Sequence, residues 1–596
     1  MILVFGGTTE GRKASEVLEE AGNAYYYSTK TGEQDITLHH GIRIDGALNV
    51  ESMRAFCCEH DIRLIVDAAH PFALRLHETI ADVAAGLQIA VIRYERIYPP
   101  RDPDITWIDD YADIIASDLR GLTLLATTGV QSISKLKWLE SKGVKVIYRI
   151  LNRESSILSA HQQGASDDQL CYYEDDCLPD ADAILLKESG ISGGFVGKVS
   201  AARKKGMRII ALKRPDMTQR IASPHSHGEN RPRCVTCCVN GPYGLRRAVE
   251  RLLPDFFPLH SGLTTGTCAT AAAIAATRRL LYGETPAEVP VTLPNGETLS
   301  AAVGFADGHA YCIKEAGDDP DVTNGIEIRA TATHSDSHHP LVEISAGEGV
   351  GRFTLPGFDY PPGEPAINKG PREMMRANIK ENVKITISVP NGEEIAKRTF
   401  NPRLGIEGGI SIIGVSGIVK PFSEEAFIDS IRKCVKVALA SGTDRIVINS
   451  GGKSERFVKA LYPTLPQQAF VEYGNYIGET LKIINDLTPL HSPLQVTLGV
   501  MLGKAVKLAA GHLDTHSRKT TMDKAFIQQM LQDAGISIDI SDMTLARELW
   551  ERIPEGGRNA FAHVVIRHCA DHCNPLLSNG QLTILLIDDD GTIHSL

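Results

Sequence analysis

The chain has 596 residues, enough for about four domains if each takes roughly 150 residues. Hydrophobic residues make up 43% and charged residues 23% of it, as in ordinary globular proteins, and the net charge of −11 argues against nonspecific binding to nucleic acid or to an anionic membrane. No apolar run approaches the ~18 residues that span a bilayer, and a strand pattern begins at once where a secretion signal would lie, so we expect a cytoplasmic protein. The twelve cysteines form no regular framework, which favours reduced thiols over disulfides.

The first half alternates short apolar runs with helical patterns. This rhythm predicts parallel sheets covered by helices. The proline-rich stretch Tyr98–Asp104 joins two such lobes, at about 1–98 and 105–213. The expected strands are Ile2–Phe5, Leu64–Ala68, Ala90–Tyr94, Leu122–Ala126, Val144–Tyr148, Ala183–Leu186 and Arg208–Leu212.

A polar, proline-bearing stretch then interrupts the alternation. Arg214–Cys238 has no periodicity, which predicts a loop or insertion at about 214–240. One short amphipathic helix follows and stops at Pro254, so we place the main domain boundary near Pro258. The first domain is therefore expected to be 1–257.

The second domain, 258–596, is expected to have two subregions, 258–422 and 423–596. The first contains a helix of small residues, Ala269–Thr277, a strand pattern at Val383–Val389 and Pro-Asn-Gly turns at Pro294 and Pro390, typical of a mixed α+β region. In the second, helices and strands alternate again, and the chain ends in a hairpin with an Asp-Gly turn. The predicted fold class is thus α/β and α+β multidomain, with a mixed sheet and an α/β subdomain in the second half.

A glycine-rich turn follows the first strand. In the dinucleotide-binding pattern G-x-G-x-x-G, Gly6 and Gly11 take the first and third places, and Thr8 replaces the second glycine. The Thr8 hydroxyl could itself bond a phosphate oxygen beside the helix start. The alternative is a strand-to-helix turn that binds no ligand. No acid ends the next strand, where Ser28–Lys30 stands, so NADH and NADPH both stay open.

Three more polar loops follow strands, where ligands bind in such sheets. "VDAAHPFA" carries Asp67 and His70, and "LATTGV" carries Thr128. "LLKESGISGGFVGK" combines glycines with Lys187 and Lys198, which suits an acidic ligand, although a solvated helix start is the alternative.

Taken together and in this order, "FGGTTEG", "DAAHPFA", "TTG" and "KESGISGG" resemble the precorrin-6A reductase family of corrin-ring biosynthesis, over about residues 1–255. The resemblance implies two Rossmann-like lobes and a nicotinamide cofactor that gives a hydride to a carbon–carbon double bond of the macrocycle. The proton for the neighbouring carbon could come from water or from His70. The residues implied are, for the cofactor, Gly6, Gly7, Thr8, Glu10 and Gly11; for the reaction cleft, Asp67, His70 and Thr128; and for substrate carboxylates, Lys187, Gly190 and Lys198.

The second half carries another series of motifs. "GLTTGTCATAAAIAA", "KEAGDDPDVTNG", "GEGVGRFTLPGF", "NPRLGIEGGISIIGVSGIV" and "AAGHLDTHSRKT" resemble the cobalt-precorrin-5B methyltransferase family of the anaerobic cobalamin pathway, over about 260–596. The resemblance implies methyl transfer from S-adenosylmethionine to a ring carbon, for which donor and acceptor must be aligned and water excluded.

The candidate residues of this half follow from strand ends and helix starts. "RIVINSGGKSE" is a strand, a glycine turn and a helix start, which suits an adenosylmethionine cradle but also an ordinary structural loop. Asp318 and Asp319 lie in a loop without calcium-loop spacing, so we expect a substrate contact there and no metal. The candidates are, for the cradle, Asn449, Gly451, Gly452, Ser454 and Glu455; for proton handling, His512 and His516; and for substrate, Thr264, Thr265, Asp318, Asp319 and Thr515.

Two groups of cysteines and histidines resemble parts of zinc sites. Neither group has a second, well-spaced ligand pair, so reduced thiols are favoured over metal in both. The groups are His225, His227, Cys234, Cys237 and Cys238 in the first half, and His568, Cys569, His572 and Cys573 near the end.

These observations predict one polypeptide with two consecutive activities in cobalamin biosynthesis. The expected partners are cobalt-corrinoid substrates, with no nucleic acid and no membrane; a homo-oligomer and contacts with other enzymes of the pathway stay open. A rival hypothesis is a nicotinamide-sensing, tetrapyrrole-binding regulator without turnover. A generic dehydrogenase fused to an unrelated transferase is weaker, because the first sheet lacks a Tyr-x-x-x-Lys pair.

Overall fold

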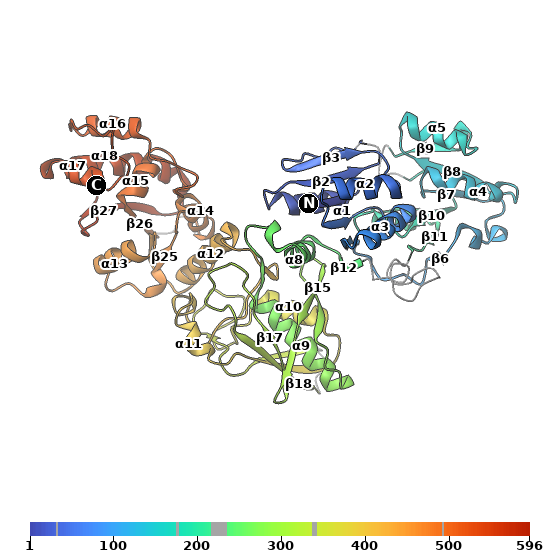
Figure 1. The fold of residues 1–596 in the computed structure, drawn as a ribbon. Coiled ribbons are helices and arrows are strands. Elements are labelled where there is room, and N and C mark those ends of the chain that lie inside the picture. The colour runs from blue at the N-terminus through green and yellow to red at the C-terminus, as the bar shows by residue number, and fades with distance from the viewer. Residues whose placement is uncertain (31, 33, 174–177, 216–234, 336–341, 491–493) are drawn as a thin grey trace. The chain divides into compact units, whose positions relative to one another are not determined.

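The computed structural model describes residues 1–596 except 31, 33, 174–177, 216–234, 336–341 and 491–493. The chain divides into two compact units (Figure 1). Unit 1 consists of Met1–His260 together with the segment Thr292–Leu299, and unit 2 consists of Ser261–Val291 and Ser300–Leu596. No helix in the described part of the chain has the length and apolar character needed to cross a bilayer.

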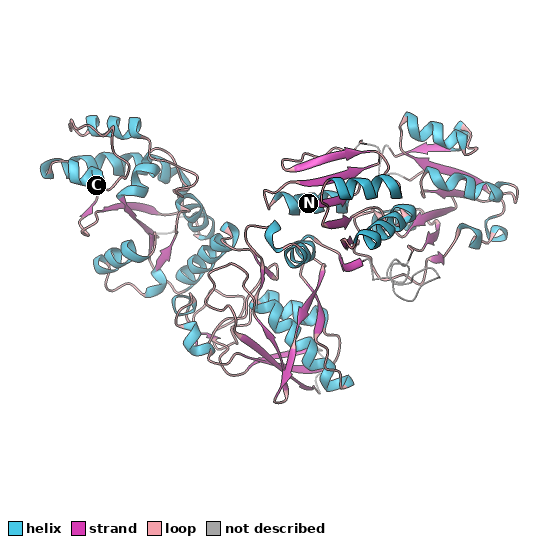
Figure 2. Ribbon diagram, in the orientation of Figure 1, coloured by secondary structure: helices cyan, strands magenta, loops and turns pink. Residues whose placement is uncertain are grey.

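The first lobe of unit 1 is a six-stranded parallel sheet in the order β12-β5-β4-β1-β2-β3, with helices on both faces (Figure 2). Alternate residues of β1 explain the two layers: Ile2 and Val4 pack against α1 and α8, whereas Leu3 and Phe5 pack against α2 and α3. The elements are β1 Ile2–Phe5, α1 Thr9–Glu19, β2 Tyr25–Thr29, β3 Gly41–Asp45, α2 Val50–Glu59, β4 Leu64–Asp67, α3 Leu74–Leu87, β5 Ala90–Tyr94, β12 Val235–Val239 and α8 Pro242–Leu252.

The second lobe repeats this architecture. Its parallel sheet has the order β6-β11-β10-β7-β8-β9, with α4 and α5 on one face and α6 on the other. The elements are β6 Thr106–Ile108, β7 Thr123–Ala126, α4 Ile133–Glu140, β8 Lys145–Ile150, α5 Glu154–Gln162, β9 Leu170–Tyr172, β10 Ala183–Lys187, α6 Phe195–Lys204 and β11 Arg208–Leu212.

The first part of unit 2 surrounds one buried helix. Helix α9, Thr265–Tyr282, is buried along Thr265–Thr277, because its alanines and threonines let strands and α10 approach closely. The mixed sheet has the order β16-β17-β18-β21-β19, in which only β19 and β21 pair in parallel. Its elements are β16 Gly304–Ala306, β17 His309–Ile313, β18 Glu327–His334, β19 Val342–Ala346, α10 Lys369–Asn378 and β21 Val383–Ser388.

The second part of unit 2 is an α/β layer structure. Parallel strands in the order β25-β24-β26-β27 are closed by the antiparallel β28. A large apolar core lies under α12, α14, α15, α16 and α18, and a smaller one lies under α13. The elements are α12 Glu424–Ala440, β24 Arg445–Asn449, α13 Gly452–Leu461, β25 Phe470–Glu472, α14 Ile477–Leu487, β26 Gln495–Met501, α15 Leu502–Ala509, α16 Lys524–Asp533, α17 Glu548–Arg552, α18 Glu555–Cys573, β27 Gln581–Ile587 and β28 Ile593–His594.

The predicted fold class is confirmed, and two local expectations are corrected. The irregular stretch ends earlier than expected, because Val235–Val239 forms β12 and pairs with β5. The first helix of unit 2 begins at Thr265, four residues before the predicted start at Ala269. The predicted turn after Pro390 leads from β21 into helix α11, Gly392–Ala396.

Candidate functional sites

The glycine turn after β1 is shaped by one tyrosine. A Cβ atom added to Gly6 would overlap the ring of Tyr27, and one added to Gly11 would lie 2.6 Å from the Gly6 Cα atom. Tyr27 is fully buried, so its ring explains why Gly6 must be glycine. At Gly11 the obstacles are the Gly6 backbone and the Tyr27 hydroxyl, which would lie 2.8 Å away. Gly7 differs, because its φ is +78° and a Cβ atom there would meet nothing within 4 Å. The open side of the turn is therefore at Gly7.

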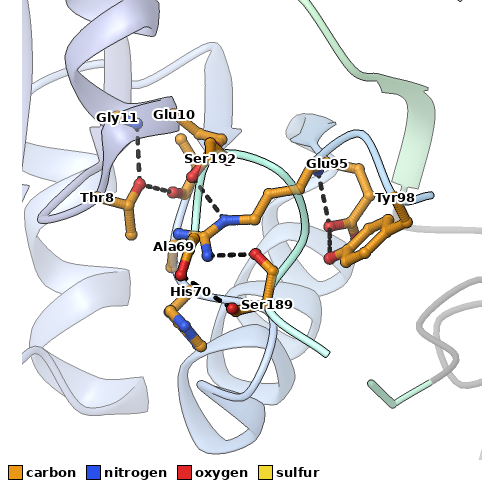
Figure 3. Close-up of polar contacts among 12 residues, drawn as sticks. Thr8, Glu10, Gly11, Ala69, His70, Glu95, Tyr98, Ser189 and Ser192 are labelled. Carbon is orange, nitrogen blue, oxygen red and sulfur yellow. Dashed lines mark hydrogen bonds and ion pairs between the residues drawn. The ribbon is translucent and has the colours of Figure 1, made fainter. Parts of the chain in front are cut away.

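The polar groups of the turn already have partners within the chain. The Thr8 hydroxyl donates to the Ala68 carbonyl at 2.7 Å and accepts from the Gly11 N–H at 2.9 Å (Figure 3). Gln34 accepts from the Gly7 N–H at 3.0 Å and from the Tyr27 hydroxyl at 2.7 Å. Sequence reasoning missed Tyr27 and Gln34, since neither belongs to the glycine pattern. Gln34 thus occupies the Gly7 N–H, a backbone donor of the kind that binds anions at the start of a helix.

Glu10 joins the turn to the second lobe. Its carboxylate accepts from Arg96 Nε at 2.7 Å and from the Ser192 hydroxyl, and Arg96 Nη1 donates to the Ser189 carbonyl at 2.8 Å (Figure 3). The Glu10 and Arg96 side chains are each only 6% exposed. Gly190, with φ +74°, leaves room for Arg96, because a Cβ atom there would lie 3.0 Å from that of the arginine. Glu10 and Gly190 therefore build the junction between the lobes.

Asp67 ends β4 inside a buried charge cluster. Its carboxylate lies 2.7 Å from His77 Nδ1 and accepts from Arg93 Nη1 at 2.9 Å. Burial opposes its charge, but Arg93 and His77 outweigh burial and hold the pKa of Asp67 below its ordinary value. His77 Nε2 lies 3.1 Å from the His70 carbonyl, so the cluster supports the loop that carries His70.

His70 lies beside this cluster and faces cations. Its Nδ1 accepts from the Phe72 N–H at 3.3 Å, which leaves the ring proton on Nε2. Burial, followed by the charges of Arg96 and Lys187, lowers the pKa of His70 to about 3. The imidazole is therefore neutral at physiological pH and can donate a hydrogen bond from Nε2.

The second lobe contributes cations that lie beside aromatic rings of both lobes. Lys187 Nζ lies 5.1 Å from the centre of the Phe72 ring, and Lys198 Nζ lies 5.5 Å from that of Tyr173, which Arg149 also faces at 4.5 Å. Flat apolar faces beside cations match a planar, polyacidic ligand. Thr128 is buried and shares a 2.6 Å hydrogen bond with Ser132, at the start of the helical turn after β7.

In unit 2, the turn after β24 combines glycines with a buried amide. The fully buried Asn449 accepts from the Gly451 N–H at 2.8 Å, and Ser454 Oγ accepts from the Ser450 N–H at 3.0 Å. A Cβ atom on Gly451 would overlap Glu472, whereas one on Gly452 would meet nothing within 4 Å. The turn is therefore closed toward β25 and open at Gly452.

Two carboxylates lie next to this turn. Glu455 accepts from Arg403 Nη2 at 2.9 Å and pairs with Lys459 at 2.7 Å. Arg403 Nη1 lies 3.6 Å from Glu472, and this buried nitrogen makes no hydrogen bond with the described residues. Burial, with repulsion from Glu455, raises the pKa of Glu472. Arg403 and Glu472 were not predicted from the sequence, because Arg403 lies 52 residues away from Glu455 in the chain.

The loop after β25 contacts only part of the region in which His512, Thr515 and His516 were predicted as site residues. Thr515 and Asn475 are joined by the Thr515 hydroxyl, which donates to the Asn475 carbonyl at 3.3 Å. His516 Nδ1 accepts from the Arg518 N–H at 3.1 Å, while His512 is exposed. Lys504 donates to the Asn475 side chain at 2.7 Å, so a cation lies at this edge of the sheet.

The remaining candidates lie around the start of α9. Thr264 caps the helix by accepting from the Thr267 N–H at 3.2 Å, and Thr265 Oγ1 accepts from the Ile413 N–H at 2.8 Å. Asp319 accepts from the Phe422 N–H at 3.1 Å, and Asp318 is exposed. The fully buried Lys314 pairs instead with Asp321 at 2.7 Å.

The cysteine groups divide between core and surface. Cys569 and Cys573 are fully buried in α18, and burial raises the pKa of Cys573 to about 12. Cys237 and Cys238 lie in β12, while His225, His227 and Cys234 lie outside the described residues. Within the described ranges no three His, Cys, Asp or Glu side chains converge as a metal site would require.

Fold and sites together define a class: one polypeptide with a unit of two parallel α/β lobes and a unit that combines a mixed sheet with an α/β part. Comparison with known proteins gives the family. The model for Precorrin-6x reductase CbiJ/CobK matches residues 1–229, that for CbiD matches 255–421, and that for the CbiD C-terminal domain matches 514–595. The second part of the chain therefore belongs to the CbiD family, and the first part matches the CbiJ/CobK reductase family. The two families indicate a bifunctional enzyme of cobalamin biosynthesis.

Curated relatives fit the assignment of the second part, and the chain is also similar to solved structures. The Cobalt-precorrin-5B C(1)-methyltransferase of Prosthecochloris aestuarii is 40% identical over 355 residues, which is 56% of this chain and 95% of the relative. That of Geobacillus sp. is 39% identical over 52% of this chain and 88% of the relative. Among solved structures, CbiD from Archaeoglobus fulgidus is 29% identical over 44% of this chain and 83% of its own, with a TM-score of 0.25. CobK precorrin-6A reductase is 17% identical over 42% and 97%, with a TM-score of 0.33.

Proposed function

We propose that unit 2 transfers a methyl group from S-adenosylmethionine to C1 of cobalt-precorrin-5B, and that unit 1 then reduces the product, cobalt-precorrin-6A, to cobalt-precorrin-6B with a nicotinamide cofactor. The observation that carries the proposal is the pairing of two families for these reaction types in one chain. The names of the curated relatives support the methyl acceptor.

The residues at the first glycine turn fit a nicotinamide dinucleotide. Gly7 has open space beside it and precedes the N-terminus of α1. Its N–H donates to Gln34, which shows where an acceptor of the cofactor could bind. We propose that Gly7 and the start of α1 hold the cofactor, which supplies a hydride when bound. NADH and NADPH both remain candidates. Lys187 and Lys198 would face the carboxylates of the substrate.

The turn after β24 fits S-adenosylmethionine. Gly452 leaves open space, and Arg403 Nη1 is a buried donor without an acceptor among the described residues. We propose that Gly452, Glu455 and Arg403 hold the donor, whose sulfonium makes the methyl group electrophilic. Protein groups here orient the donor and exclude water.

The test is the product mass after incubation with cobalt-precorrin-5B, S-adenosylmethionine and reduced nicotinamide. We expect the gain of one methyl group and two hydrogen atoms. Binding of substrate and cofactor without any change of mass would contradict the proposal and favour the regulator.

Two alanine variants separate the activities. Gly7→Ala places a methyl group in the open side of the first turn, and Gly452→Ala does the same in the second. Each variant should weaken the binding of the cofactor at its own turn and stop the reaction step of its own unit. Gly22→Ala and Gly442→Ala are matched controls, because these glycines also have positive φ and open space but lie away from the turns. Equal effects in variant and control would reject the assigned cradles.

A further inference from the structure

Lys187 is a cation of unit 1 that has no anionic partner among the described residues. It ends β10, is half-buried, and forms no ion pair with the residues that the structure describes. The adjacent Glu188 is turned to other cations, at 2.9 Å from Arg101 and 2.8 Å from Arg214. The Lys187 ammonium therefore keeps all its protons available on the side of the Phe72 ring.

The other polar groups nearby are unsuited to proton donation. His70 uses Nδ1 to accept from a backbone N–H and is neutral, so it has no imidazolium proton to give. Asp67 is an ionised acceptor between Arg93 and His77. The Thr128 hydroxyl is paired with Ser132. Among these four groups, Lys187 is the one that carries an acidic proton, and its charge acts on His70.

We propose that Lys187 is the general acid of the reduction, which rests on the proposed function of unit 1. When bound, a reduced nicotinamide would supply the hydride for one carbon of the substrate's double bond. The Lys187 N–H bond breaks, a C–H bond forms at the neighbouring carbon, and the amine left behind takes a proton from solvent. Two electrons and one hydrogen come from the cofactor and one proton comes from lysine, so the step balances.

The surroundings of Lys187 tune it for this role. Burial, and then the charge of Lys135 on α4, lower the pKa of Lys187 to about 8. His70 faces it from the loop after β4 as a neutral ring, and Phe72 contributes no charge. A general acid works best when its pKa lies close to the working pH. An unperturbed lysine, at 10.5, would be a weaker acid.

The kinetic test compares K187R and K187M with the wild-type protein. Arginine keeps the positive charge but does not release a proton near neutral pH, so both variants should lose about 10²- to 10⁴-fold in kcat. K187R, which keeps the charge that faces the substrate carboxylates, should change KM much less than kcat. The wild-type kcat should fall as the pH rises through about 8, because the ammonium form is consumed. Both variants should lack this fall of kcat at alkaline pH, called the pH limb below. Small primary ammonium ions should restore the kcat of K187M. The control K198M should raise KM and keep the limb.

A second readout does not depend on turnover. NMR titration of ¹⁵N-labelled lysine side chains in the full chain, assigned with K187R, should give a pKa of about 8 for Lys187. K135M should raise it, because a like charge is removed.

The outcomes separate the two proposals. A Lys187 pKa near 10.5, or K187M that keeps the wild-type kcat and pH limb, would overturn the role of Lys187 alone. No reduction by the wild-type protein with either nicotinamide would overturn the proposed function and, with it, the general acid.

Discussion

At the scale of single residues, buried charges shape the loops of the reductase unit. Asp67 is bonded to His77 and Arg93 and also accepts from the Ala69 N–H at 3.2 Å. The carboxylate thus fixes the chain just before His70. Removing one partner of such a cluster leaves the others buried without compensation.

Asp67→Asn should therefore destabilise the first lobe by about 3–5 kcal/mol at neutral pH. The folded-state pKa of Asp67 is depressed, so its stabilisation is present above the ordinary value of 3.8 and is lost as the pH falls below it. The difference between variant and wild type should be full above about pH 5 and shrink in more acidic solution. The urea dependence of amide hydrogen exchange in β4 measures this difference in the free energy of unfolding. Asp82→Asn on the exposed side of α3 is the control, and equal effects would contradict the prediction.

A second residue-scale prediction concerns Gly6. Gly6→Ala should destabilise the first lobe by about 1–3 kcal/mol, because the added methyl group overlaps the Tyr27 ring. In a Tyr27→Ala background the same substitution should cost much less, which a double-mutant cycle of unfolding free energies would detect. Gly197→Ala, in helix α6 with open space around it, should be neutral or stabilising. Additive effects of the Gly6 and Tyr27 substitutions would reject the packing explanation.

At the scale of elements, the start of α1 and the loop after β10 are held together by the Glu10–Arg96 pair. The pair is buried and the loop Ser189–Gly194 supplies two of its hydrogen-bond partners. Because Lys187 lies two residues before this loop, the pair also influences where the second lobe places this cation.

Arg96→Met should loosen this loop strongly, because it leaves Glu10 as a buried, unpaired charge at a cost of about 3–5 kcal/mol. The double variant with Glu10→Leu should recover part of the loss, since both charges are then absent. Hydrogen exchange of Ser189–Gly194 is the measurement. Asp180→Asn breaks an exposed ion pair with Lys205 in the same lobe and should leave this exchange unchanged. No recovery in the double variant would contradict the account.

The elements also show what sequence alone could provide. Ile2–Phe5, Ala90–Tyr94 and Arg208–Leu212 were predictable to the residue, because continuous apolar runs in a βαβ rhythm indicate buried parallel strands. Strand β12 was hidden, since Val235–Val239 directly follows a polar stretch and its pairing with β5 is non-local. In the sites, strand-end loops could be located, but the partners Tyr27, Arg96 and Arg403 could not, because they come from distant parts of the chain.

At the scale of the whole molecule, unit 1 is not one continuous stretch. The segment Thr292–Leu299 belongs to it, although 31 residues of unit 2, Ser261–Val291, intervene. Within unit 1, Glu297 is 1% exposed and accepts from the Tyr243 N–H at 3.0 Å and the Gly244 N–H at 3.1 Å. It thereby caps α8, whose own N-cap residue, Gly241, has no side chain.

The fragment 1–260 should therefore have a frayed α8, even though it contains every residue of both lobes. Losing the Glu297 carboxylate leaves two helix N–H groups without their charged acceptor, at a cost of about 1–3 kcal/mol. Glu297→Ala in the full chain should reproduce the faster hydrogen exchange of the first turn of α8, whereas Glu288→Gln, an exposed glutamate shortly before the segment, should not. If the fragment protects this turn as well as the full chain does, the cap is dispensable and unit 1 is complete without Thr292–Leu299. If it does not, a stable reductase requires chain from beyond its own family match, which ends at residue 229.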